Sequence, residues 1–89
     1  MIFEISPEQC RAARQLLNWT AQDLESACGM SARTISLFET SKRELRPDNM
    51  RAIVEALETA GIEFLPDGRG KGEGVRLKEP RKTAAGDDQ

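Results

Sequence analysis

TAQDLESACGMSARTISLFET, residues 20–40, contains two short amphipathic segments joined at a single glycine. Thr20 precedes Asp23 by three residues, a spacing at which the hydroxyl and the carboxylate can cap the start of a helix. Gly29 readily adopts the left-handed conformation that ends a helix, and Ser31 can cap the next one. This segment therefore predicts two helices separated by a short turn.

We expect these helices over residues 20–28 and 31–40, and the second has two different faces. Helical spacing turns Ile35 and Phe38 toward the core. The outward positions are Ala32, Arg33, Ser36 and Leu37. Small and basic side chains on a surface nearly free of acid are typical of a helix that enters a DNA groove. For Leu37, packing inward beside Phe38 is an equal alternative.

Two further helices are predicted on either side of this pair. Ser6, Pro7 and Gln9 form a complete helix start, so one helix should cover residues 7–17. Pro47 begins another, over residues 47–60, whose inner face is Met50, Ile53, Val54, Leu57 and Ala60. Together these helices predict a four-helix domain over residues 1–60, in a mainly α fold.

After residue 61 the pattern changes from helical to extended. Residues 62–65 and 75–78 flank a glycine-rich stretch, which predicts a β-hairpin over residues 61–78 with a flexible, solvated loop. An isolated two-stranded hairpin is marginal in water, so it needs a partner. Two partners are open: the extended start, residues 2–5, or the same hairpin of a second subunit, which makes it a candidate dimerisation element. Residues 79–89 lack apolar spacing and are predicted to be a disordered tail.

Matches to one family of regulators are scattered through residues 7–60. They are the QCRAARQLLNW opening, Asp23-Leu24, Ala27, Gly29, Ser31, Thr34-Ile35, Phe38-Glu39, Pro47 and the closing ALETAGIEF. Together, in this order, they resemble the Cro and phage-repressor class of helix-turn-helix proteins, the XRE family of bacterial and phage regulators. The resemblance implies a four-helix DNA-binding domain, although the family usually continues into a fifth helix where this chain has the hairpin.

Two positions depart from the family pattern. The helix at residues 20–28 often begins with a glutamine that grips phosphate, whereas this chain has Ala21 there, followed by Gln22. Glu25 occupies a position at which the family usually keeps alanine, because the two helices approach closely. Its carboxylate must therefore either bend out to solvent or find a partner.

The resemblance implies that the helix over residues 31–40 enters the major groove of double-stranded DNA. Arg33 is the main candidate base reader, because its planar fork can pair with guanine O6 and N7. Ala32 and Leu37 could meet a thymine methyl group, and Ser36 could bond either kind of base edge. The candidate contacts to the DNA backbone are Thr20, Gln22, Ser31, Thr34, Lys42, Arg43 and Arg46. The three loop cations could also be merely solvated.

Arg14 and Glu39 match family positions that form an ion pair inside the fold. The resemblance assigns them to architecture, linking the first helix to the end of the DNA-reading helix. Loss of DNA binding on truncation of either partner would then report unfolding rather than a lost DNA contact.

Composition argues against catalysis. The chain has no histidine, so the commonest general base and metal ligand are absent. Cys10 and Cys28 lack metal-ligand spacing, and each lies on the apolar face of its helix. Trp19 follows the end of the first helix. We therefore expect core roles for all three, no enzymatic activity, no cofactor and no metal.

Charge distribution supports DNA binding better than the total does. The 13 basic and 15 acidic residues give a net charge of −2. Residues 31–47 hold four basic and two acidic side chains, which gives +2 for that segment. An acidic surface on the side of the protein that faces away from DNA would also weaken non-specific binding to DNA.

These observations predict a small transcriptional regulator that binds DNA sequence-specifically, most simply a repressor acting as a homodimer on an inverted repeat. The alternative is an antitoxin or adaptor that covers a protein partner and keeps the helix-turn-helix as scaffold. The first residues, MIFEISPEQ, include Glu4 and Pro7 and no long apolar run, so we expect no signal peptide, no membrane association and a cytoplasmic location.

Overall fold

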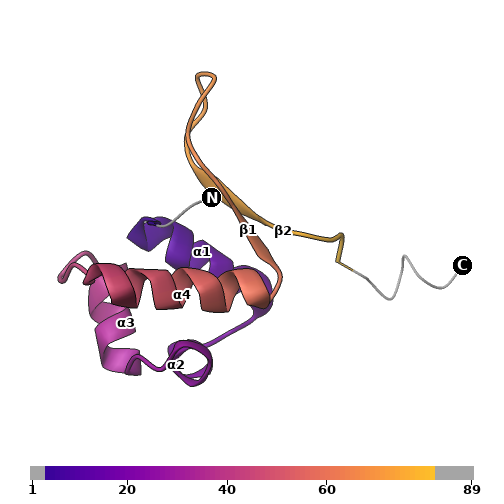
Figure 1. Ribbon diagram of the computed structural model, residues 1–89. Coiled ribbons are helices and arrows are strands. Elements are labelled where there is room, and N and C mark those ends of the chain that lie inside the picture. Colours follow the sequence, from indigo (N-terminus) through magenta and orange to yellow (C-terminus); the bar gives the residue numbers. More distant parts are fainter. Residues whose placement is uncertain (1–3, 82–89) are drawn as a thin grey trace, which may run out of the picture.

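The computed structural model describes residues 4–81 and shows four helices followed by a two-stranded antiparallel hairpin (Figure 1). The elements are α1 (Pro7–Leu17), α2 (Ala21–Cys28), α3 (Ala32–Glu39), α4 (Pro47–Thr59), β1 (Ile62–Leu65) and β2 (Gly74–Leu77). This order confirms the predicted mainly α fold with a C-terminal hairpin. None of the helices in the described part is long and apolar enough to cross a membrane.

The predicted start signals act as helix caps. The Ser6 hydroxyl accepts a hydrogen bond from the Gln9 amide, while the Gln9 side chain accepts one from the Ser6 amide, which completes a capping box at α1. Thr20 and Asp23 form the same reciprocal pair at α2. Gly29 then ends α2 with a φ of 86°, a conformation that costs glycine little.

The first helix covers the residues expected from the sequence, and the other three are one or two residues shorter than expected. Thr20 and Ser31 have extended backbones and cap α2 and α3 from outside, while Thr40 and Ala60 follow the last residues of α3 and α4. A capping residue satisfies the free amides of a helix without adopting its dihedral angles. The turn joining α2 to α3 is correspondingly short.

The core lies between α4, the inner faces of the other helices and β1. Its most deeply buried side chains are Leu24, Ile35, Ile53, Leu57, Ile62 and Cys10. Trp19 and Cys28 are half-buried and pack against this cluster. Helical spacing places Leu24, Ala27 and Cys28 on one face of α2, yet Ala27 is exposed.

The hairpin packs on the helices of its own chain, a partner that the sequence analysis did not consider. Its inner face buries Ile62 and Phe64 against the helical core. The buried Gln9 side chain of α1 donates to the carbonyl of Gly74 at 3.0 Å and to that of Leu65 at 3.4 Å. The outer face is polar and carries an ion pair between Glu63 and Arg76.

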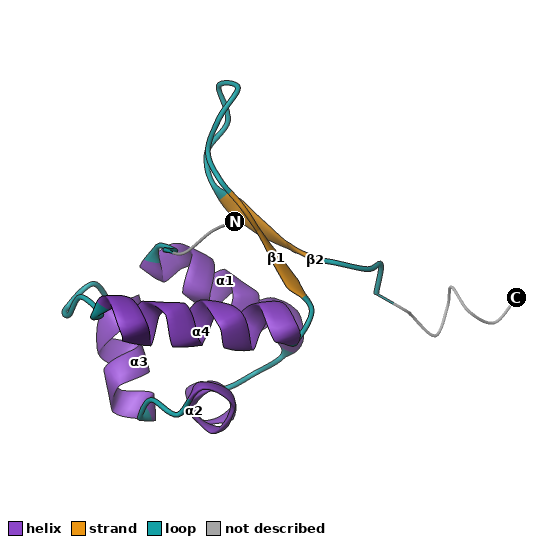
Figure 2. Ribbon diagram, in the orientation of Figure 1, coloured by secondary structure: helices purple, strands orange, loops and turns teal. Residues whose placement is uncertain are grey.

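Beyond the strands the hairpin continues as a narrow arm, of which the strands form only the base (Figure 2). Gly68 and Lys71 exchange backbone hydrogen bonds of 2.9 Å, so the tip is a closed turn rather than the open loop expected from its glycines. Arg69 and Gly70 both have positive φ, 54° and 76°, as a two-residue turn of type I′ requires. The tip projects away from α2 and α3 (Figure 1).

The two ends of the chain lie partly outside the described residues. This holds for residues 1–3 of the extended start and for residues 82–89 of the predicted disordered tail. Ile5 is buried in the core. Residues 79–81 have no regular secondary structure, yet the Arg81 guanidinium donates to the Leu16 carbonyl at 2.6 Å.

Replacing Gln9 with leucine should lower the free energy of unfolding by about 1–3 kcal/mol, because two hairpin carbonyls and the Ser6 amide lose a buried partner. Urea unfolding measures this change, and amide hydrogen exchange should show faster opening in the hairpin than in α4. Glu8→Gln, one residue earlier and exposed, is the matched control and should shift stability by less than about 0.5 kcal/mol. Equal stability of the Gln9→Leu variant and the wild type would contradict the anchoring role.

Candidate nucleic-acid interface

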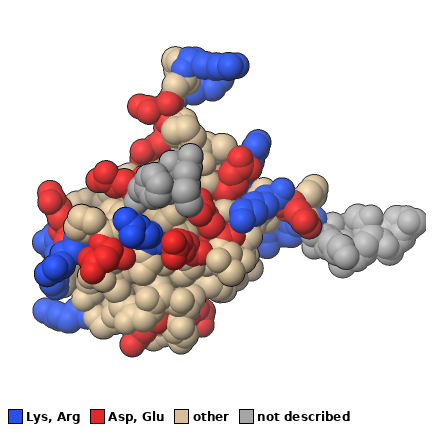
Figure 3. Space-filling view, viewed as in Figure 1, with Lys and Arg blue, Asp and Glu red and all other residues tan. Residues whose placement is uncertain are grey.

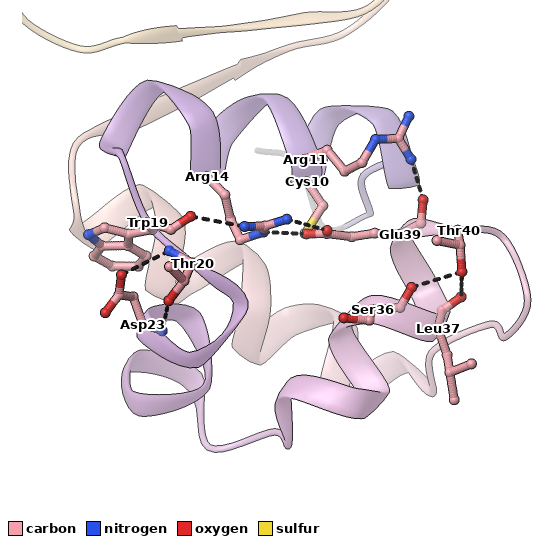
Figure 4. Close-up of polar contacts among 10 residues, drawn as sticks. All are labelled: Cys10, Arg11, Arg14, Trp19, Thr20, Asp23, Ser36, Leu37, Glu39 and Thr40. Carbon is pink, nitrogen blue, oxygen red and sulfur yellow. Dashed lines mark hydrogen bonds and ion pairs between the residues drawn. The ribbon is translucent and has the colours of Figure 1, made fainter.

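The outer face of α3 consists of the four residues Ala32, Arg33, Ser36 and Leu37. Arg33 and Ser36 are exposed, whereas Ala32 and Leu37 are half-buried. Ile35 and Phe38 face inward and are buried. Leu37 is not among the side chains packed on the core, and Figure 4 shows it pointing away from the buried contacts of α3. Of the two alternatives for Leu37, the structure favours the outward one.

The N-terminal end of α3 is closed by three hydrogen bonds. The Ser31 hydroxyl accepts from the Thr34 amide at 3.1 Å and donates to the Thr34 hydroxyl at 3.0 Å. The amide of Ala32 donates to Glu25 Oε1 across the turn, at 3.1 Å. The sequence left two alternatives for the Glu25 carboxylate, exposure to solvent or a partner. The structure shows both, because Glu25 is exposed and its carboxylate accepts this hydrogen bond. The Thr34 hydroxyl keeps its proton for a further acceptor.

The predicted backbone-contacting residues lie at three places, of which the start of α3, with Ser31 and Thr34, is described above. Thr20 and Gln22 are exposed at the start of α2, where the Thr20 hydroxyl already accepts from the Asp23 amide at 3.1 Å. Lys42, Arg43 and Arg46 are exposed in the segment between α3 and α4. Within residues 4–81, the side chains of Gln22, Lys42 and Arg43 take part in no hydrogen bond or ion pair.

Arg46 differs slightly from the other two cations, because its Nε lies 4.0 Å from a carboxylate oxygen of Asp48. Both side chains are about four-fifths exposed, at 83% and 79%, so solvent screens this contact and leaves Arg46 available. Figure 3 shows basic side chains gathered at the left edge of the molecule, over the α3–α4 segment, with acidic ones scattered over α4 and the hairpin base. The charge is therefore uneven, as the sequence indicated.

The tip of the hairpin is a separate basic site. Arg69 and Lys71 are exposed there, and Figure 1 places the tip at the opposite end of the molecule from α2. These two cations therefore do not lie beside the outer face of α3.

Beneath α3, Arg14 and Glu39 form a two-point ion pair. Arg14 Nη2 lies 2.7 Å from Glu39 Oε1, and Arg14 Nε lies 2.8 Å from Glu39 Oε2 (Figure 4). The side chains are 16% and 4% exposed, respectively, so the carboxylate is the more deeply buried partner. The third nitrogen, Nη1, donates to the Trp19 carbonyl at 2.9 Å. Arg14 thereby ties the end of α3 to both α1 and the segment that leads into α2.

Two further residues of α1 join this cluster. The Cys10 thiol donates to Glu39 Oε2 at 3.0 Å, and the Arg11 guanidinium donates to the Glu39 carbonyl at the end of α3. Arg11 is exposed, but its long side chain reaches α3. This contact depends on how the two helices pack, and spacing within one helix does not reveal it.

The cluster also shifts ionisation equilibria. Burial raises the pKa of the Cys10 thiol, and the hydrogen bond to Glu39 raises it further, because a thiolate there would face a carboxylate. The hydrogen bonding that Arg14 donates to Glu39 raises the pKa of Arg14, against the opposing effect of burial. Cys10 is therefore a neutral donor, and its role is structural.

Comparison with known proteins supports this picture of the site. A helix-turn-helix family model matches residues 11–64, from within α1 to within β1. No curated protein matches the chain. The match covers all of α2, α3 and α4, and leaves out the hairpin tip and β2.

Glu39→Ala should lower the free energy of unfolding by about 3–5 kcal/mol, because it strands the buried Arg14 cation. Chemical denaturation measures the loss. Glu63→Ala is the matched control, since it breaks an Arg–Glu pair with a similar 2.9 Å contact at the surface, and its unfolding midpoint should hardly change. Equal effects of the two substitutions would show that the buried pair is no more important than the exposed one.

Stability should fall above about pH 8.5 as Cys10 loses its proton in the unfolded chain but keeps it in the folded one. A raised folded-state pKa of an acid means that the folded state binds more protons, so its stability is complete below the unfolded pKa and declines above it. The decline from one thiol reaches about 1.4 kcal/mol per pH unit. Denaturation between pH 8 and 10 should show a shallower decline for Cys10→Ala than for Cys28→Ala. Parallel curves for the two variants would contradict this assignment.

Proposed function

The chain belongs to the Cro/C1-type helix-turn-helix family, the XRE family, and we propose that it is a transcriptional repressor that binds an inverted repeat in double-stranded DNA as a homodimer. Family membership makes it a DNA-binding regulator of this type. The observation that carries the rest is the outer face of α3, where the exposed Arg33 side chain makes no ion pair within residues 4–81 and lies on the same face as the small residues Ala32 and Ser36. A regulator of this kind works where the genome is, which supports a cytoplasmic location.

In this proposal α3 is the recognition helix and its N-terminal half enters the major groove. Arg33 pairs with the O6 and N7 of a guanine, the commonest specific contact between proteins and DNA. Ser36 lies one turn further along the same face and bonds a base edge. Ala32 is small enough to allow close approach, and Leu37 provides apolar contact with a thymine methyl group.

Backbone contacts position this helix. Thr34 donates its free hydroxyl proton and Gln22 its side-chain amide to phosphate oxygens, while Thr20 and Ser31 contribute hydroxyl and helix N-terminal groups. Lys42, Arg43 and Arg46 neutralise phosphates beside the groove and release counterions, which makes binding weaker at higher salt. None of the seven carries sequence information directly.

Dimerisation follows from the small footprint of one recognition helix. A single short helix covers too few base pairs to be selective in a genome, and two-fold dimers read two half-sites about one helical turn apart. The hairpin, residues 61–78, is the proposed dimer element. Its apolar face is already covered by its own chain, so pairing would use the free strand edges and the polar outer face. A dimer on a promoter then blocks transcription.

Selection from a pool of randomised duplexes at near-physiological salt tests this function. Enrichment of an inverted repeat supports the dimeric repressor, and its half-site spacing gives the separation of the two recognition helices. Retention without a motif, fading steeply with salt, would mean only phosphate attraction. That result would favour the alternative in which the helix-turn-helix is a scaffold for a protein partner.

Arg33→Ala should weaken binding to the selected site by about 1–3 kcal/mol and leave thermal stability nearly unchanged, because the Arg33 side chain is exposed and makes no ion pair within residues 4–81. Arg33→Lys is the matched variant: it keeps the charge but lacks the planar fork, so it should retain non-specific binding while losing preference for guanine. Fluorescence anisotropy with the selected duplex and a mutated one measures both effects. Equal weakening on the two duplexes would refute the role of Arg33 as a base reader.

A further inference from the structure

We propose that Glu25 is a specificity-determining residue, whose carboxylate accepts a hydrogen bond from the exocyclic amine of a cytosine at the end of the recognition helix. This inference rests on the proposed function, because it requires α3 to enter the major groove. Glu25 lies on α2, outside the four-residue outer face of α3, and is a position at which the sequence departs from its family.

The hydrogen bond from the Ala32 amide fixes the Glu25 carboxylate at the N-terminal end of α3, which enters the major groove in the proposed docking. Glu25 Oε1 accepts from the Ala32 amide at 3.1 Å, and Ala32 is the first residue of α3. The N-terminal end of the recognition helix is the part that meets base edges in this docking mode. The Glu25 side chain is exposed, so nothing in residues 4–81 buries it away from DNA. A flexible surface glutamate is thereby held at the first residue of α3.

The second carboxylate oxygen is left free. Within residues 4–81, Oε2 of Glu25 takes part in no hydrogen bond, and the residue takes part in no ion pair. An ionised carboxylate can only accept hydrogen bonds, so a base that faces it must supply a donor. In the major groove the donors are cytosine N4 and adenine N6. Adenine also presents its N7 acceptor at that edge, which would repel the carboxylate, whereas cytosine does not.

The negative charge of Glu25 strengthens the preference for cytosine by disfavouring other bases. A carboxylate near DNA is repelled by the phosphates and by the acceptor atoms of guanine and thymine, and this repulsion is offset only where a base donates a hydrogen bond to it. The helices α1, α2 and α4 each carry an acid of their own in the first turn, at Glu8, Asp23 and Asp48. α3 has none, and Glu25 reaches it from the neighbouring helix. Glu25 thus places a negative charge at the N-terminal end of α3, which has no acidic residue in its own first turn.

Three variants separate base reading from capping and from simple repulsion. Glu25→Gln keeps an acceptor for the Ala32 amide but removes the charge and adds a donor. Glu25→Asp keeps the charge but withdraws the carboxylate by one methylene group. Glu55→Gln, at an exposed position on α4, changes the net charge by the same amount elsewhere and serves as the control. Thermal melting should give wild-type midpoints for Glu25→Gln and Glu55→Gln.

Selection from randomised duplexes is then run on all four proteins. The wild type and Glu55→Gln should enrich the same motif, with a cytosine beside the guanine assigned to Arg33. Glu25→Gln and Glu25→Asp should each lose preference for that cytosine by about tenfold, with the rest of the motif unchanged. Only Glu25→Gln should also bind unrelated duplexes more tightly, since it loses a negative charge at the N-terminal end of α3, whereas Glu55→Gln loses one on α4 and Glu25→Asp loses none.

Two outcomes overturn the proposal, and they are distinguishable. An unchanged motif in Glu25→Gln, with tighter binding to every duplex, would reduce Glu25 to a cap with a repulsive charge, while the repressor function would stand. No motif for the wild type itself would remove the proposed function and this inference with it.

Discussion

Glu39 is a carboxylate with 4% exposure inside a small domain, and the orientation of α3 depends on how its charge is neutralised. Arg14 meets it with two nitrogens and the Cys10 thiol adds a third donor, so the buried charge is paired and hydrogen-bonded. Taking a carboxylate out of water costs several kcal/mol unless such partners replace the solvent. All of these partners belong to α1. The cluster therefore fixes the end of α3 on α1, and with it the direction in which the outer face points.

The same cluster reconciles a net charge of −2 with DNA binding. Glu39 is internal and neutralised by Arg14, so it adds little to the field outside, and the cations around α3 and its following segment dominate there. Acidic side chains are scattered over α4 and the hairpin base (Figure 3). A long-range field depends on where charges lie and how they are screened, rather than on their sum.

The hairpin shows how a local pattern can indicate an element without indicating its partner. Its alternating residues and turn glycines predict two strands, and its marginal stability in isolation predicts that it must pack against something. Neither signal names the surface. In the structure that surface is the chain's own α1 and α4, and Gln9 serves twice, as part of the α1 capping box and as a donor to the hairpin carbonyls. A glutamine at a cap predicts only the first role.

What the sequence determined by itself was therefore local: the four helices with the caps Ser6, Thr20 and Ser31, the turn at Gly29, the β-hairpin and the outward placement of Arg33. Each of these depends on residues within a few positions of one another, whose spacing the chain displays directly. Family resemblance added the pairing of Arg14 with Glu39, which no spacing within one helix could give. Tertiary structure alone decided which surface the hairpin packs against, the hydrogen bond from Arg11 to the end of α3 and the contact of Glu25 with Ala32. These contacts join separate elements, and their geometry is set by how the helices pack, so they exist only once the core has formed.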